Sequence, residues 1–167
     1  MTDIIEGKPE PGQNNKFAVV VSKFNGFVTE KLLEGCLKTL KEYGVKDRDI
    51  DIVKVPGAFE IPAIVKNLLD IKKYSSVICL GAVIRGETPH FDYICSSVSN
   101  QIGSLSAISG MPVIFGIITT NTIDQALDRA GGKAGNKGSE AALAALEMVD
   151  VTFKVKSSNI SPARFSS

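Results

Sequence analysis

The chain has 167 residues, 19 Lys and Arg against 18 Asp and Glu, and an apolar fraction of 44%. This length predicts one domain with a substantial core, and the balanced charge excludes a whole-chain attraction to nucleic acid or to anionic membranes. No apolar run reaches the roughly 18 residues of a transmembrane helix, and the first residues lack the apolar region of a signal peptide. We therefore expect a cytoplasmic protein with no membrane or nucleic-acid partner.

Residues 1–15 are expected to form an arm, because the segment 8–15 (KPEPGQNN) is polar and rich in turn-forming residues. The apolar run 17–22 that follows it is typical of a parallel strand buried on both faces. We expect strands over 17–22, 50–55, 76–80 and 112–119.

Apolar residues recur with helical period between these strands. We expect helices over 28–43, over about 59–69, from Thr88 through the region of Ile108, from Thr122 to Gly131, and from near Ser139 to Lys156. Thr122 and Gln125 form a capping box, and a glycine-rich loop is expected up to Gly138. The polar tail, residues 157–167, is expected to be loose.

The helix after Thr88 is long and has one apolar face. That face is expected to contain Phe91, Ile94, Cys95, Val98, Ile102, Leu105 and Ile108.

Strands that alternate with helices four times predict an α/β fold with right-handed crossovers. We expect a three-layer αβα sandwich with a four-stranded parallel, flavodoxin-like sheet, in a single domain over residues 16–156. Ligands in such folds bind beyond the carboxyl ends of the strands. Here those ends lead into residues 23–25, 56–60, 81–90 and 119–121, which favours one composite site.

The cysteines Cys36, Cys79 and Cys95 are widely spaced within apolar patterns. This spacing indicates buried free thiols in a reducing compartment rather than disulfides or metal ligands. A zinc site needs closer clustering of Cys and His, and the chain has one histidine, so we expect no metal.

The segment GAVIRGETPHF, residues 81–91, follows the third predicted strand and ends in a helix-start signal, with Thr88 as N-cap and Pro89 at the first helical position. A helix N-terminus presents unpaired N–H groups that can bind phosphate. The one histidine, His90, lies in that first turn. The positive helix end disfavours imidazolium, so we expect a neutral ring that can accept a proton. The alternative is a histidine that only helps to cap the helix.

Two further motifs can contribute to a site. Pro56-Gly57-Ala58-Phe59-Glu60 combines a tight turn, an aromatic ring and a carboxylate, and Phe59 and Phe24 can stack on a flat heterocycle. The alternative is a simple turn between a strand and a helix. Arg129, Lys133 and Lys137 recur every four residues among glycines, and they can surround an anion or form a solvated basic loop. Neither a P-loop nor a dinucleotide fingerprint is present.

Taken in order, these motifs resemble the lumazine synthase family of riboflavin biosynthesis over about residues 16–153. The matching segments are Lys23-Phe24-Asn25, VPGAFE at 55–60, GAVIRGETPHFDY at 81–93, PVIFGIIT at 112–119 and RAGGKAGNKGSEAA at 129–142. The resemblance implies condensation of 5-amino-6-(D-ribitylamino)uracil with 3,4-dihydroxy-2-butanone 4-phosphate, which releases phosphate and water. It also implies that neither a metal nor an organic cofactor takes part.

The resemblance assigns roles to individual residues. His90 corresponds to the residue that transfers protons, Arg129 to the phosphate ligand and Phe24 to the ring that stacks on the pyrimidine. The remaining substrate-binding positions implied are Asn25, Ala58, Phe59, Glu60, Val83, Ile84, Glu87, Thr88, Phe115, Lys137 and Glu140. Glu87 is expected to use only its backbone, with its carboxylate pointing away. Lys133 is a weaker assignment.

The resemblance also implies a homo-oligomer, because the family supplies Phe115, Arg129, Lys137 and Glu140 from a neighbouring subunit. Family members form pentamers, and some assemble twelve pentamers into a capsid of sixty subunits. The compact loop GGKAGNKG favours the capsid. The arm is then expected to cross to a neighbouring sheet, the alternative being a free end.

Three other functions compete with this one. A non-catalytic flavin or lumazine carrier needs Phe24 and the 56–60 turn, but it needs neither His90 nor Arg129. A phospho-signalling receiver domain needs acidic residues after the first strand and an Asp at the end of the third, where the chain has Val21-Ser22 and Leu80-Gly81. An inactive shell protein has no use for the complete set of site residues.

Overall fold

The computed structural model describes residues 3–158. Four parallel strands form its main sheet in the order β2-β1-β3-β4. Their bounds are Phe17–Ser22 (β1), Ile50–Val55 (β2), Ser76–Ile84 (β3) and Val113–Thr120 (β4). Every residue of β1 is buried, as the continuous apolar run of this segment predicts for a strand covered on both faces.

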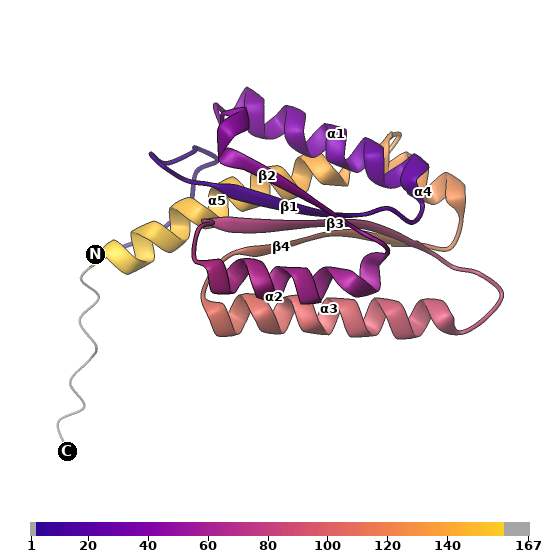
Figure 1. Cartoon of the computed structure of the whole chain (residues 1–167). Helices are drawn as coiled ribbons and strands as arrows, with labels where there is room; N and C mark the ends of the chain where they lie inside the picture. The colour runs from indigo at the N-terminus through magenta and orange to yellow at the C-terminus, as the bar shows by residue number, and fades with distance from the viewer. Residues whose placement is uncertain (1–2, 159–167) are drawn as a thin grey trace, which may run out of the picture.

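Helices connect the strands and cover both faces of the sheet (Figure 1). They are α1 (Gly26–Glu42), the short 3-10 turns η1 (Asp47–Asp49) and η2 (Ala58–Glu60), α2 (Ile61–Ile71), α3 (His90–Ser109), α4 (Ile123–Arg129) and α5 (Lys137–Ser157). Helices α1, α4 and α5 lie on one face, and α2 and α3 lie on the other. The expected three-layer αβα sandwich with a flavodoxin-like parallel sheet is confirmed.

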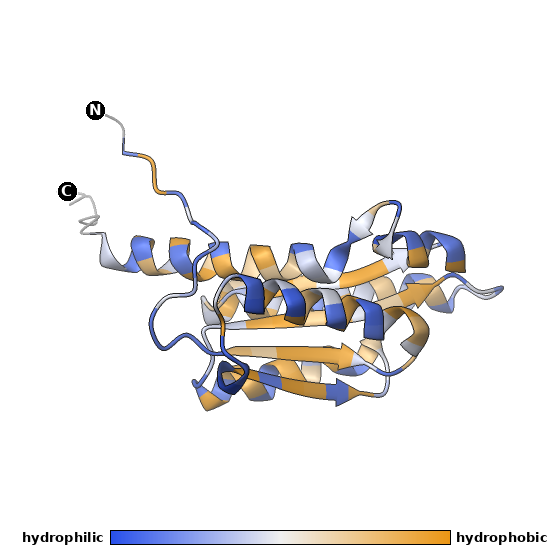
Figure 2. Cartoon of the chain, turned by 90° about the horizontal axis from the view of Figure 1, so that it is seen from above, coloured by the Kyte–Doolittle hydropathy of each residue, from blue (hydrophilic) through white to orange (hydrophobic). Residues whose placement is uncertain are grey.

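Two cores fill the spaces between these layers, because side chains alternate between the faces of a strand. In β1, Val19 and Val21 point into the core beneath α1 and α5, whereas Ala18 and Val20 point into the core beneath α2 and α3. Figure 2 shows the strands as the most apolar part of the chain, with hydrophilic residues on the outward sides of the helices. The cores hold the strand ends, and hence the loops that follow them, in a fixed arrangement.

Several predicted boundaries are wrong. The third strand extends to Ile84 rather than ending at Leu80, because residues 81–84 continue the pairing with β4. The segment 58–60 forms η2, so that α2 begins at Ile61 and not near Phe59. On α3 only Val98 and Ile102 are fully buried, and Ile108 in the last turn is 87% exposed.

The predicted glycine-rich loop up to Gly138 is also wrong, because its residues are structured. Strands β5 (Ala130–Gly132) and β6 (Gly135–Asn136) form a small antiparallel hairpin, and α5 begins directly after it. The Asn136 side chain caps α5 by accepting hydrogen bonds from the N–H groups of Gly138 and Ser139. A Cβ at position 138 would overlap the carbonyl oxygen of Leu32, so glycine lets α5 begin against α1.

The N-terminal arm runs along the molecule's own helix α5. The backbone N–H of Lys8 donates to Asp150 Oδ2 over 2.8 Å, and Lys154 Nζ donates to the carbonyl oxygen of Glu6 over 2.9 Å. Within this single chain the arm is therefore attached rather than a free end. Of the predicted tail, residues 159–167 lie outside the described part of the chain, and Ser157 ends α5.

Candidate active site

The first element of the site is the junction between β1 and β2. The N–H groups of Lys23 and Phe24 donate to the carbonyl oxygens of Val55 and Pro56 over 2.8 and 3.0 Å. These bonds extend the pairing of the two strands beyond their ends. As a result, the Phe24 ring lies beside the 56–60 turn, and it stays 71% exposed.

Asn25 fixes the same junction to the neighbouring strand. Its backbone has a left-handed conformation, with φ 57°, which asparagine tolerates better than most residues. The side-chain amide donates to the carbonyl oxygen of Ala82 in β3 over 2.9 Å. Asn25 thus joins the loop after β1 to β3, a structural role besides the ligand contact expected from the sequence.

A cleft of about 530 Å³ opens at these strand ends on the side of α2 and α3. We call it the histidine cleft. The predicted site residues that line it are Phe24, Asn25, Ala58, Phe59, Glu60, Val83, Ile84, Thr88 and His90. Gly57, Ala82, Gly86, Phe91, Tyr93 and Ile94 complete its wall. The wall is thus mainly apolar and aromatic, with a few polar groups, as expected of a pocket for a flat organic molecule.

His90 begins α3 at the edge of this cleft, and its side chain is exposed. The predicted capping is wrong in detail, because Pro89, not Thr88, is the N-cap and the helix begins at His90. The cause is a tight first turn, in which the N–H of Asp92 donates to the Pro89 carbonyl over 3.1 Å. The histidine therefore lies beside the positive end of a 20-residue helix, as the sequence predicts.

A second hollow, of about 450 Å³, lies along β4, beside the end of α4 and the start of α5. We call it the arginine groove. The predicted residues that line it are Phe115, Arg129, Lys137 and Glu140. Its remaining wall comes from β4 and from Ala141 and Ala144 of α5. Strand β4 is an edge strand with β3 as its one neighbour in the main sheet, so the groove follows an open edge.

The charged groups of the arginine groove are held by local contacts. Arg129 is half-buried, and its Nη1 donates to the carbonyl oxygen of Gln125 over 3.0 Å. Lys137 Nζ pairs with Glu140 Oε2 over 2.6 Å, one turn along α5. Two cations therefore lie in a groove that faces outward.

The two hollows have no lining residue in common. None of the described residues that line the histidine cleft is Lys or Arg, and the arginine groove contains no histidine. Of the predicted site residues, Glu87 and the weaker assignment Lys133 line neither hollow. Glu87 lies exposed in the loop between β3 and α3, and Lys133 lies exposed between β5 and β6. One chain therefore presents two sets of complementary groups at separate places.

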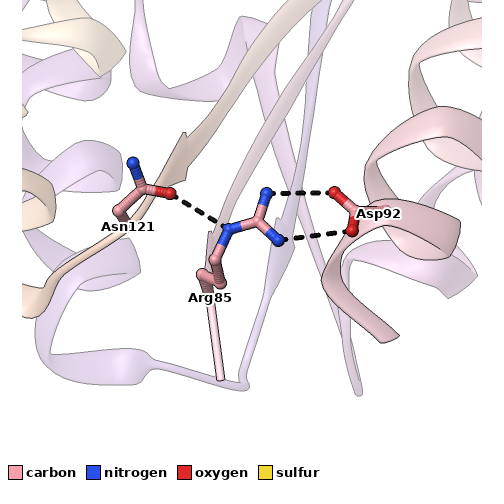
Figure 3. A network of polar contacts seen from close by, with 3 residues as sticks. All are labelled: Arg85, Asp92 and Asn121. Atoms are coloured by element: carbon pink, nitrogen blue, oxygen red, sulfur yellow. Dashed lines mark hydrogen bonds and ion pairs between the residues drawn. The ribbon is translucent and has the colours of Figure 1, made fainter. Parts of the chain in front are cut away.

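A network around Arg85, which sequence reasoning missed, supports the loop before His90 (Figure 3). The guanidinium donates to both carboxylate oxygens of Asp92, over 3.2 and 3.0 Å, and to Oδ1 of Asn121 over 3.1 Å. It also lies 4.2 Å from the ring centroid of Phe91. The hydrogen bonds to Asp92 raise the pKa of Arg85 further above its usual range. The only sequence signal is that Arg85 and Asp92 lie on either side of His90 within the motif GAVIRGETPHFDY.

Comparison with known proteins gives the family of this chain. A family model described as 6,7-dimethyl-8-ribityllumazine synthase matches residues 14–152. The chain belongs to the 6,7-dimethyl-8-ribityllumazine synthase family. A protein of this name from Desulfotalea psychrophila (strain LSv54 / DSM 12343) is 52% identical over 151 residues, which cover 90% of this chain and 97% of that protein.

The matched range contains every residue that lines the two hollows, so both belong to the part of the chain that defines this family. Between residues 3 and 158, no helix combines the length and apolar character that crossing a membrane requires. Within the same range, no three His, Cys, Asp or Glu side chains group together as metal ligands would.

None of the three cysteines lines either hollow. Cys36 and Cys79 are buried, as predicted, whereas Cys95 on α3 is only partly buried. Burial raises the pKa of the Cys36 thiol to about 12 and that of Cys79 further still. Both thiols are therefore protonated at neutral pH and are poor nucleophiles.

Proposed function

We propose that this chain is a transferase that forms 6,7-dimethyl-8-ribityllumazine from 5-amino-6-(D-ribitylamino)uracil and 3,4-dihydroxy-2-butanone 4-phosphate. The observation that carries the proposal is the division of the site residues between two hollows. The histidine cleft has the aromatic and acid–base groups, and the arginine groove has the cations. A cytoplasmic enzyme of the penultimate step in riboflavin biosynthesis needs both sets.

The histidine cleft suits the pyrimidine substrate. The exposed rings of Phe24 and Phe59 offer flat faces to an aromatic heterocycle. Glu60, at the start of α2, can accept hydrogen bonds from the ribityl hydroxyls. Backbone groups of Val83 and Ile84, at the end of β3, can contact the edge of the pyrimidine.

The phosphate group needs a cation that the described wall of this cleft lacks. We propose that Arg129 of an adjacent copy supplies it, with Phe115, Lys137 and Glu140 completing the wall. The fork of an arginine matches two phosphate oxygens. The Thr88 hydroxyl and the backbone N–H groups near Glu87, before the positive end of α3, complete the phosphate site.

His90 then transfers protons between the two bound substrates. The substrate amine attacks the ketone, and loss of water gives an imine. Elimination of phosphate and ring closure with loss of a second water give the lumazine. Each step moves protons, for which an imidazole is suited near pH 7. Alignment of the two substrates supplies much of the acceleration, because well-oriented reactants gain roughly 7–11 kcal/mol.

A site made from two copies requires a homo-oligomer. We propose a closed ring, a pentamer, either alone or as one of twelve in a sixty-subunit capsid, since closed rings form when one surface of each copy meets a different surface of the next. In such a ring the open edge of β4 faces the histidine cleft of the neighbour.

Incubation of the purified protein with both substrates tests this function. We expect the absorbance and fluorescence of the lumazine to appear together with an equal amount of inorganic phosphate. Binding of lumazine without product formation would support the carrier instead. The matched control is an Arg129→Ala protein of the same oligomeric size.

A further inference from the structure

Arg85 is the first residue after β3, at the point where the chain leaves the sheet. Its backbone N–H donates to the carbonyl oxygen of Thr120 over 2.9 Å, which continues the pairing with β4. The base of the side chain is thereby fixed to two strands. From this fixed base the guanidinium extends to Asp92 in α3.

The Arg85 side chain links the two ends of the segment 86–91. Arg85 lies at one end of the segment and Asp92 at the other, and the two side chains meet through a two-pronged hydrogen-bonded pair (Figure 3). Of the enclosed residues, Gly86, Thr88 and His90 line the histidine cleft. The loop that presents these groups is therefore held at both ends by a single ion pair.

Two further contacts stiffen this closure. Nε donates to Asn121 at the end of β4, and the guanidinium lies against the face of Phe91, which itself lines the cleft. An exposed ion pair alone contributes little. A guanidinium that is held at a carboxylate, an amide and an aromatic ring has few other orientations, and lysine cannot reproduce this geometry.

We propose that Arg85 is a positioning residue, whose guanidinium holds the 86–91 loop and the first turn of α3 so that His90 points into the cleft. The inference rests on the proposed function of the histidine cleft and deepens it. Arg85 itself does not line the described wall of the cleft, so its effect is transmitted through Asp92 and Phe91.

The test compares Arg85→Ala, Asp92→Ala and the double variant, each as the full chain in its native assembly. Lys66→Ala is the matched control, because it removes an exposed ion pair with Asp70 within α2, away from the cleft. Arg85→Lys is a second variant that keeps the charge and loses the fork. Two quantities are measured: steady-state kinetics for each substrate, and hydrogen exchange of the amides at 92–95, which close the first turn of α3.

For Arg85→Ala we expect those amides to exchange about five- to twentyfold faster and kcat to fall about tenfold through misplacement of His90. The KM for the pyrimidine should stay within about twofold, because Phe24 and Phe59 are untouched. The double variant should exchange these amides no faster, and have no lower kcat, than either single variant, since both substitutions remove the same contact. Arg85→Lys should resemble Arg85→Ala, and Lys66→Ala should resemble the unaltered protein.

Three results would overturn the proposal. Faster exchange with unchanged kinetics would leave Arg85 a purely structural role. A loss of activity with unchanged exchange would mean that Arg85 contacts a substrate directly. Additive effects in the double variant would mean that Arg85 and Asp92 act separately. If the unaltered protein forms no lumazine, the proposed function fails, while hydrogen exchange still tests whether the Arg85–Asp92 pair holds the first turn of α3.

Discussion

The histidine cleft and the arginine groove differ in chemistry and in position. The cleft lies at the ends of β1, β2 and β3 beside α3, and its wall is mainly apolar. The groove lies along the open edge of β4 beside α5, and it carries Arg129 and Lys137. Neither has everything that the condensation of a pyrimidine with a sugar phosphate needs. The difference supports the proposal that the functional unit combines surfaces from two copies.

The two hollows are nevertheless joined within one chain. Asn121 accepts a hydrogen bond from Arg85 and, through its backbone N–H, donates to the Gln125 side chain in α4. The carbonyl oxygen of Gln125 in turn accepts from Arg129. The loop that carries His90 and the helix that carries Arg129 are therefore fixed to the same end of β4. Within each chain these hydrogen bonds link the two hollows.

The largest effect is expected at the groove. Arg129→Ala should lower kcat/KM for the phosphorylated ketone about 10²–10³-fold, because a charge-assisted pair with phosphate is lost. Steady-state kinetics with each substrate varied in turn measure this. Arg48→Ala, in the distant turn η1, is the matched control. An unchanged apparent affinity for the ketone in Arg129→Ala would move the phosphate site elsewhere.

A smaller effect is expected in the cleft. His90→Ala should reduce kcat about 10²-fold, near the lower end for general acid–base catalysis, with little change in either KM. The reaction should continue, because substrate alignment remains. Single-turnover measurements separate the chemical step from binding. Normal binding with no detectable turnover would mean that proton transfer outweighs alignment.

Removal of the stacking ring should affect one substrate only. Phe24→Ala should raise the KM for the pyrimidine about tenfold, since stacking on an aromatic side chain is lost. Its effect on the KM for the ketone should be within about twofold. Phe153→Ala, which removes an exposed ring from the distant end of α5, is the control. Equal changes for both substrates would contradict the assignment of the cleft to the pyrimidine.

The smallest effect is expected far from both hollows. Lys154 and the N–H of Lys8 hold the pKa of Asp150 below its usual range. The contact therefore contributes stability above the unfolded pKa of about 3.9, and this contribution is lost as the pH falls through the lower folded pKa. Asp150→Asn should lower Tm by about 1 °C at pH 7 and leave it unchanged at strongly acidic pH. Thermal melts across pH measure this, and an equal shift at every pH would contradict it.

Sequence reasoning predicted the strands better than the ends of the helices. Strands β1 and β2 have the predicted bounds. β1 is a continuous apolar run buried on both faces, and Pro56-Gly57 ends β2, a partly buried edge strand. The start of α5 at Lys137 was predicted two residues late, near Ser139, because Gly138 disfavours a helix by itself. A glycine is nevertheless needed at position 138, because the backbone of Leu32 leaves no room for a side chain there. No local sequence pattern reveals this contact.

The sequence named the candidate site residues one by one, and the family resemblance already placed Arg129 on a neighbouring copy. The family motifs supplied His90, Phe24 and Arg129, and the structure adds that the first two line one hollow and the third lines another. The network around Arg85 was missed because it depends on three elements that meet only in the folded chain. Long-range contacts of this kind leave little signal in one sequence.

The most direct test of a shared site mixes two damaged chains. His90→Ala and Arg129→Ala chains, with different affinity tags, are co-expressed and purified through both tags as mixed assemblies. If each site takes His90 from one copy and Arg129 from the next, random mixing gives about one quarter of sites with both groups, and so about one quarter of the unaltered activity. Activity no higher than the average of the two separate variants would contradict a site built between copies.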